Sequence, residues 1–184
     1  MSKTALIYAS KYGATKKYAI HIAAQTGADL YELKKKFTFD FSRYDTIIFG
    51  GGLYAGKLNG AKFLEQNVSE LVGKKVVLFS CGLADPTIAV EAQQTAKDIS
   101  KSLPEQLKNT VHSFQLRGKI DYANLSFVHK MMMSMLNNML KKKDREKLAT
   151  TQIDMIENYG GVLDYTNLAL AQPLIDYVCS ITNK

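Results

Sequence analysis

Hydroxyl groups and a glycine lie close together where the first apolar segment of the chain ends. Ser10, Gly13 and Thr15 follow the apolar run 5–9, and a helix is predicted at about 14–26. A glycine lets the backbone turn sharply, so that N–H groups at the start of the following helix point at one position. Such a turn binds anions, and phosphate groups in particular. An ordinary strand-to-helix turn with a Ser or Thr cap is the alternative interpretation.

Two further turns have an unusual composition. Three consecutive glycines, Gly50 to Gly52, stand where the apolar segment 44–50 ends. A backbone without side chains lets a flat molecule approach closely. Tyr54 follows two residues later, where its ring is placed to stack on such a molecule. Cys81-Gly82 follows another apolar segment, 75–80. One turn alone is weak evidence of a site, and the three together are much more specific.

The order of the predicted elements brings the three turns together. Apolar strands alternate with helices through short connections, which is typical of a parallel, doubly wound sheet that binds ligands at the carboxyl ends of its strands. We therefore predict an α/β fold with five parallel strands and a helical insertion after strand five, at about 119–160, in a single domain that spans 1–184. The strands are expected at about 5–9, 29–33, 44–50, 75–80 and 111–116, and the helices at 14–26, 61–72, from Asp85-Pro86 to about 102, and 166–182.

Composition narrows the functional classes. The chain has 184 residues and a formal net charge of +7, which favours acidic partners, but no nucleic-acid motif accompanies the charge and nucleic acid is not an expected partner. Cys81 and Cys179 lack metal-ligand spacing and are interpreted as free thiols in a reducing compartment. His21 and His112 are isolated and His129 lies within a Met-rich segment, and all three are taken as structural. We expect a cytoplasmic protein with no metal site and no catalytic side chain.

The three turns resemble the FMN-binding loops of flavodoxins. Residues 10–15 lack the Gly-Lys-Ser/Thr ending of the Walker pattern and the three spaced glycines of the dinucleotide pattern. The sequence Ser-x-x-Gly-x-Thr after the first strand is instead similar to a flavodoxin phosphate loop. The resemblance implies a flavodoxin-like sheet with FMN as cofactor, and it covers about two thirds of the chain. It implies a phosphate site formed by Ser10, Lys11, Tyr12, Gly13, Ala14 and Thr15, and ring contacts from Gly52, Leu53, Tyr54, Ala55, Cys81 and Gly82.

The following part of the chain is similar to another family. Residues 114–122 and the Met-rich segment after them resemble the menaquinone-dependent protoporphyrinogen oxidases, which have a flavodoxin fold. This resemblance implies an oxidoreductase that passes electrons from a reduced apolar substrate through FMN to a quinone. The alternative is a flavodoxin that carries electrons to a redox partner protein and has no substrate of its own. Flavodoxins are typically acidic, and the basic charge of this chain fits that role poorly.

The Met-rich segment allows two interpretations. On a helix, Lys130, Ser134 and Asn137 fall on a polar side and the methionines form a wide apolar face, which is followed by the basic run 141–147. Apolar stripes of this spacing usually pack on the domain, with the charged end in solvent. The other interpretation is a surface for a flexible apolar partner, or for peripheral contact of residues 122–147 with an anionic membrane at the inner face of the cell.

Overall fold

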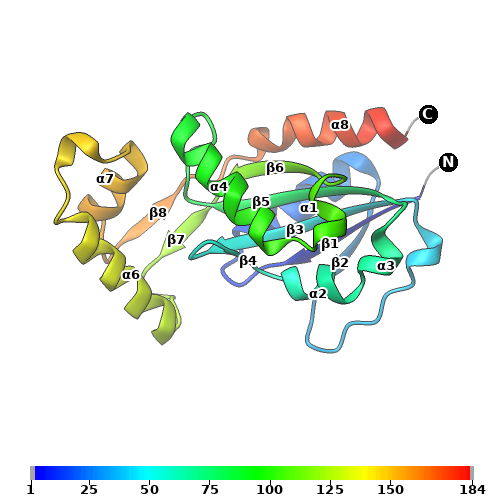
Figure 1. Ribbon diagram of the computed structural model, residues 1–184, viewed down its shortest axis with the longest axis horizontal. Helices are drawn as coiled ribbons and strands as arrows, with labels where there is room; N and C mark the ends of the chain where they lie inside the picture. Colours follow the sequence, from blue (N-terminus) through cyan, green and yellow to red (C-terminus); the bar gives the residue numbers. More distant parts are fainter. Residues whose placement is uncertain (1–2, 183–184) are drawn as a thin grey trace.

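The computed structural model describes residues 3–182, in which strands and helices alternate along the chain (Figure 1). The first half comprises β1 (Thr4–Ala9), α1 (Ala14–Thr26), β2 (Asp29–Glu32), the 3-10 helix η1 (Phe41–Arg43), β3 (Thr46–Tyr54), β4 (Lys57–Leu58), α2 (Ala61–Gln66), α3 (Val68–Leu71) and β5 (Lys75–Gly82). The second half comprises α4 (Ala89–Ser102), α5 (Glu105–Lys108), β6 (His112–Arg117), β7 (Lys119–Asp121), α6 (Phe127–Leu140), η2 (Arg145–Lys147), α7 (Thr150–Glu157), β8 (Val162–Asp164), η3 (Leu168–Ala171) and α8 (Gln172–Thr182).

Five parallel strands form the central sheet of the described residues, in the order β2-β1-β3-β5-β6. The short strand β4 pairs antiparallel with the end of β3. Counted among the parallel strands alone, the order is 2-1-3-4-5, that of a doubly wound sheet with its ligand crevice beside the first and third strands. The predicted fold class is therefore confirmed.

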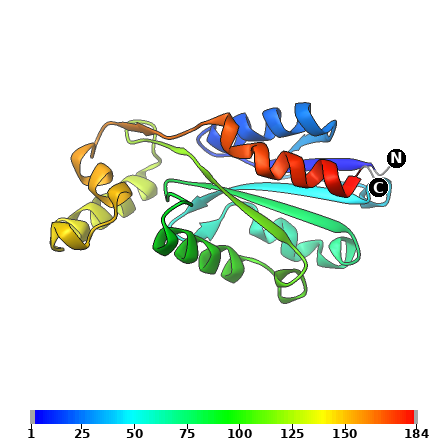
Figure 2. The ribbon, with the colours of Figure 1, turned by 90° about the horizontal axis from the view of Figure 1, so that it is seen from above.

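Helices cover both faces of this sheet, as Figure 2 shows. Successive side chains of a strand point to opposite faces, and Leu6 packs on the α1 and α8 side while Ile7 packs on the side of α2 to α5. The α1 face buries Tyr18 and Ile22 completely, and Gly27 ends α1 in the left-handed conformation that the sequence predicts for it (φ 68°). Two apolar cores thus fix the sheet and hold the carboxyl ends of its strands in place.

Strand β3 differs from its prediction. It continues through the three glycines to Tyr54, because Gly50 and Gly51 pair with β1 on one side and all three glycines pair with β5 on the other. The glycines are required by packing: a Cβ atom on Gly50 would lie 2.2 Å from the ring of Phe79. The chain turns only at Ala55 (φ 48°) and Gly56 (φ 73°), where two positive φ angles close a tight hairpin to β4.

Three predicted helices have other bounds. The helix expected at 61–72 breaks at Asn67, whose backbone is not helical (φ −118°, ψ 21°). Asp85 does not cap α4, which begins at Ala89, because its carboxylate accepts hydrogen bonds from the N–H and hydroxyl of Thr87 and closes a turn instead. The last helix begins at Gln172 rather than at 166, with Pro173 in its first turn, where a proline needs no hydrogen-bond donor.

The insertion after β6 begins and ends with strands that the sequence analysis missed. Strands β7 and β8 form an antiparallel ribbon, with Ile120 opposite Leu163, and a small apolar cluster forms around these two residues with Tyr122 and Leu125. Helices α6 and α7 project from the ribbon beyond the carboxyl ends of the parallel strands (Figure 1). None of the helices described within 3–182 is long and apolar enough to span a membrane.

Candidate functional site

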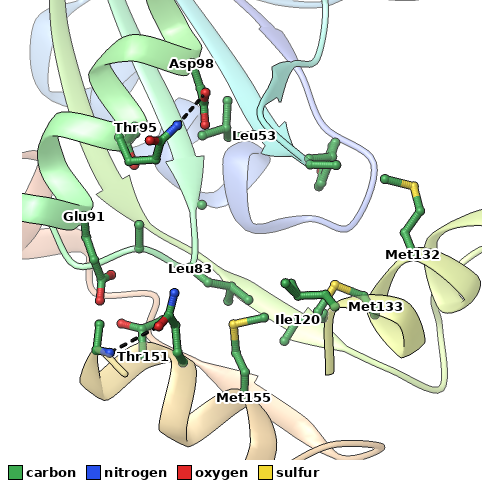
Figure 3. A pocket seen from close by; sticks show the side chains of 18 of the residues that line it. Leu53, Leu83, Glu91, Thr95, Asp98, Ile120, Met132, Met133, Thr151 and Met155 are labelled. Carbon is green, nitrogen blue, oxygen red and sulfur yellow. Dashed lines mark hydrogen bonds between the residues drawn. The ribbon is translucent and has the colours of Figure 1, made fainter. Parts of the chain in front are cut away.

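A cavity of about 850 Å³ lies where the three unusual turns meet helices α6 and α7. In Figure 3 the side chains of Leu83, Ile120, Met133 and Met155 converge on it from the turn after β5, from β7, from α6 and from α7. Its walls are largely apolar, with Glu91 and Asp98 from α4 and Lys119, Lys143 and Lys147 from the insertion among the lining residues.

The turn after β1 has the backbone geometry typical of anion sites. Gly13 takes a left-handed conformation (φ 93°) directly before α1, and the hydroxyl oxygen of Ser10 accepts hydrogen bonds from the N–H groups of Gly13 (3.2 Å) and Lys16 (3.3 Å). The N–H groups of Ala14 and Thr15, in the first turn of α1, have no partner inside the helix. Ala14 and Thr15 line the cavity, and the positive end of the helix dipole adds to the attraction for an anion.

Tyr54 lies across this turn. Its ring packs edge-on against Tyr12, with 5.5 Å between ring centroids, and 5.4 Å from the ring of His129. The backbones of Lys11 and Tyr12 donate toward the Tyr54 hydroxyl, but burial has the larger effect and raises the pKa of this phenol to about 12. The Tyr54 hydroxyl is thus neutral and lies near two N–H groups of the turn, where a bound anion would compete with it.

The turn after β5 provides an inert wall. Cys81 is a free thiol and is buried, and burial raises its pKa to about 12 although a hydrogen bond with Thr15 acts in the opposite direction. Gly118 donates its N–H to the carbonyl of Gly82 at 2.6 Å, and a Cβ atom on Gly118 would lie 2.8 Å from the sulfur of Cys81. The thiol is therefore held neutral in a close-packed place, where it is a poor nucleophile.

A hydrogen-bond cluster joins the turn after β1 to the start of α6. The hydroxyl of Tyr12 lies 2.7 Å from Nδ1 of His129 and accepts from the N–H of Ser126 at 3.3 Å. Lys11 donates to the hydroxyl of Ser126 at 3.3 Å. Burial first, and the charge of Lys11 second, lower the pKa of His129, which lines the cavity. The sequence analysis took His129 as structural and did not place it at the site.

A second polar contact holds the far side of the insertion. Arg117, the last residue of β6, pairs with Asp85 at 3.0 Å and donates to the hydroxyl of Thr151 on α7 at 3.4 Å. Its guanidinium group also lies 3.7 Å from the centre of the Tyr165 ring. Hydrogen bonds from Thr87, and then the charge of Arg117, lower the pKa of Asp85. The carboxylate is thus ionised, and α7 is fixed relative to β5 and β6.

The cavity contains most of the residues that the sequence analysis assigned to a cofactor, although their contacts with a cofactor stay a prediction. Those that do not line it are Ser10, Lys11, Gly13 and Gly52; Lys11 lines a smaller neighbouring cavity of about 510 Å³. The predicted residues that line the cavity are Tyr12, Ala14, Thr15, Leu53, Tyr54, Ala55, Cys81 and Gly82. The sequence analysis missed the opposite wall, for which the run of methionines was the available signal.

The residues present fit an FMN group. The turn before α1 offers N–H groups and a helix N-terminus for a phosphate, and the adjacent cavity offers apolar walls for a flat ring. No group of three or more His, Cys, Asp or Glu side chains in the described part of the chain is arranged to hold a metal ion.

Comparisons with solved structures give distant likenesses. A putative flavoprotein from Bacteroides eggerthii is 16% identical over 62% of this chain and 86% of its own, with a TM-score of 0.45. A flavoprotein from Lactobacillus acidophilus in complex with FMN is 15% identical over 64% and 93%, with a TM-score of 0.46. A flavodoxin mutant from Fusobacterium nucleatum bound to FMN is 14% identical over 69% and 74%, with a TM-score of 0.37. No curated protein matches the chain.

A family model gives the assignment. The model described as a flavodoxin domain matches residues 5–147, which include the three turns, the parallel sheet except Thr4, and helix α6. The strand order found above is the one expected of this fold. The chain therefore belongs to the flavodoxin-domain family.

Proposed function

We propose that the protein is an FMN-binding redox protein, and the observation that carries this proposal is the meeting of three turns at one cavity. The turns follow β1, β3 and β5, which are neighbours in the sheet. FMN, when bound, supplies the redox chemistry that no side chain of the site provides. The family match supports this cofactor, and FMN appears in the descriptions of two of the similar structures.

Each wall of the cavity then has a separate task. The N–H groups of Ala14 and Thr15 bind the phosphate, Leu53 and Tyr54 cover one side of the ring, and the buried Cys81 closes another side without exchanging protons. Helices α6 and α7 supply the apolar wall opposite the turns. A dry, apolar surrounding strengthens every polar contact made inside it.

We further propose an oxidoreductase of the menaquinone-dependent protoporphyrinogen oxidase type, which oxidises a reduced apolar substrate and uses a quinone as electron acceptor. The cavity supports this because it extends beyond the three turns to Met133 and Met155. Methionine side chains are flexible and polarisable, and they adapt to flat apolar molecules. An electron carrier without a substrate, the alternative function, needs only the three turns and leaves the apolar wall of α6 and α7 without a role.

The visible absorption spectrum of the purified protein, before and after addition of FMN, tests the cofactor. Anaerobic mixing with reduced protoporphyrin and a soluble menaquinone analogue then tests the reaction. A yellow protein that turns over supports both proposals, a yellow and inert one supports the carrier, and a protein that cannot bind FMN contradicts the main proposal. Met133→Ala should reduce turnover and leave FMN bound, whereas Met131→Ala, a control at an exposed position outside the cavity, should change neither.

A further inference from the structure

Helix α6 presents a second apolar face, which is exposed to solvent and borders the cavity at Met135 and Met139. Four of its residues recur at every fourth position and therefore form one stripe along the helix. The exposed fractions are 78% for Phe127, 62% for Met131, 72% for Met135 and 51% for Met139, and Val128 beside them is 59% exposed. No part of the described chain covers this stripe.

The polar side of α6 departs from its prediction at Asn137, whereas Lys130 is exposed as expected. Asn137, expected in solvent, is 6% exposed and faces inward with Leu140, while the methionines of the stripe face outward. Packing decides this: Met133, on the inner side, belongs to the apolar cluster around Ile120 and Leu163. An outward stripe of flexible apolar side chains stays costly to expose to water unless something covers it.

A basic cluster lies at the end of the stripe. Lys141, Lys142 and Lys143 directly follow α6, are exposed, and form no ion pair with any residue in the range 3–182. The basic residues after them are neutralised in part, since Lys147 pairs with Asp144 at 2.6 Å and Arg145 pairs with Glu157. Three uncompensated positive charges therefore adjoin the exposed apolar stripe.

We propose that this outer face of α6, with Lys141 to Lys143, docks on an anionic lipid bilayer. Apolar side chains on one face and lysines beside them are the two features by which a helix lies in the plane of a membrane surface. Met135 and Met139 belong both to the exposed stripe and to the cavity lining. An apolar molecule dissolved in the bilayer reaches the cavity along these side chains without crossing water. The lipid contact itself does not depend on the proposed FMN chemistry.

Sedimentation with vesicles tests the docking. The full-length protein is mixed with phosphatidylcholine–phosphatidylglycerol vesicles (3:1) or with phosphatidylcholine alone, and the bound fraction is measured at low and high salt. We expect salt-sensitive binding to the anionic vesicles only. Charge reversal of Lys141, Lys142 and Lys143 to Glu should lower the partition coefficient by at least on the order of 100-fold, since each lysine near an anionic surface contributes about 1 kcal/mol.

The chain provides matched controls. Lys34, Lys35 and Lys36 form an equal and exposed lysine run elsewhere, so their reversal to Glu changes the net charge equally and should leave most of the binding intact. Met135→Ser should weaken binding, and Val72→Ser, at another exposed apolar residue, should not.

Three results would overturn the proposal. Equal losses of binding for the two lysine runs would indicate a response to net charge alone, and no binding to anionic vesicles would contradict the docking directly. A dimer that forms without lipid and that Met135→Ser dissociates would make the face an interface between copies of the chain. The FMN absorbance of the same samples shows separately whether the cofactor proposal holds.

Discussion

The hydroxyl of Tyr12 lies 2.7 Å from Nδ1 of His129, so a hydrogen bond joins the turn after β1 to helix α6 beside the cavity that both residues line. Tyr12 is also the acceptor for the N–H of Ser126, the residue before α6. The phosphate turn and the Met-rich helix lie more than a hundred positions apart in the sequence and meet through Tyr12 and, at Ser126, through Lys11. The position of α6 relative to a bound cofactor therefore depends on Tyr12.

Tyr12→Phe should loosen the start of α6 without disturbing the sheet. The change removes three hydrogen-bond contacts, one to His129 and two to Ser126, and keeps the ring, so we expect a loss of about 1 kcal/mol in the free energy of unfolding. Amide hydrogen exchange should rise in 127–140 and stay unchanged in β1 and β3. A double-mutant cycle with His129→Ala should give a coupling energy of at least about 0.5 kcal/mol. Additive effects of the two mutations would mean that the hydrogen bond between Tyr12 and His129 does not stabilise the position of α6.

The same contact predicts a dependence of stability on pH. Burial and the charge of Lys11 lower the pKa of His129 below its ordinary value of 6.5. The unfolded chain therefore takes up the proton first, and this contribution to stability is present above pH 6.5 and is lost as the pH falls through the lowered pKa. The melting temperature should drop between pH 7.5 and 5.5, and the drop should be smaller in His129→Gln. Equal drops would assign the pH dependence to other groups.

Tyr54 should respond differently to loss of its hydroxyl and loss of its ring. Tyr54→Phe removes a hydroxyl that lies near the N–H groups of Lys11 and Tyr12 and keeps a ring for stacking, so FMN should bind as tightly as in the wild type or a few-fold more tightly. Tyr54→Ala removes the wall and should weaken binding about tenfold, since an aromatic pair contributes about 1 kcal/mol beyond its buried area. Titration of FMN fluorescence measures both. Equal weakening would show that the hydroxyl binds the cofactor rather than competing with it.

The sheet and its ligand edge could be predicted because their signals are local. Apolar runs of strand length, separated by helices, specify a parallel doubly wound sheet, and Gly13 and Gly27 mark the two ends of α1. The bounds that were wrong depend on distant contacts. In the sequence, the three glycines of β3 indicate a loop. In the structure they belong to a strand, because the ring of Phe79 and the two neighbouring strands pack against them.

The far wall of the cavity could not be read from the sequence for the same reason. Helical periodicity shows that α6 has two unlike sides, but not which side faces inward. That choice is made by β7 and β8, two strands of three residues that are 40 positions apart and too short to give a pattern. Asn137 was placed on the wrong side in consequence, and the position of His129 beside the cavity was not foreseen.

Arg117 should be difficult to replace, even by lysine. Arg117→Lys keeps the charge near Asp85 but loses the planar stacking on Tyr165 and the reach to Thr151. We expect a loss of about 2 kcal/mol in the free energy of unfolding, since the carboxylate is left with a poorer partner in a half-buried place. Urea denaturation measures it, and Lys108→Arg, in an exposed ion pair with Glu105, is the control that should change little. A cost below that of the control would show that Arg117 is not needed to hold α7.

Gly50 and Gly73 separate the two reasons for which a glycine is required. Gly50→Ala places a Cβ atom 2.2 Å from the buried ring of Phe79, whereas Gly73→Ala meets no atom within 4 Å and is opposed only by its positive φ angle of 88°. Overpacking a closed core costs about 1–3 kcal/mol and can exceed that where both neighbours are sheet strands, while an alanine in the left-handed region costs about 1 kcal/mol. Gly50→Ala should therefore lower the melting temperature more than Gly73→Ala does.

Gly50→Ala should also weaken FMN binding, since β3 must shift at the carboxyl edge that holds Leu53 and Tyr54. Gly73→Ala should leave FMN binding unchanged. If Gly50→Ala were as stable as the wild type, the close packing of β3 on β5, on which the geometry of the site depends, would be wrong.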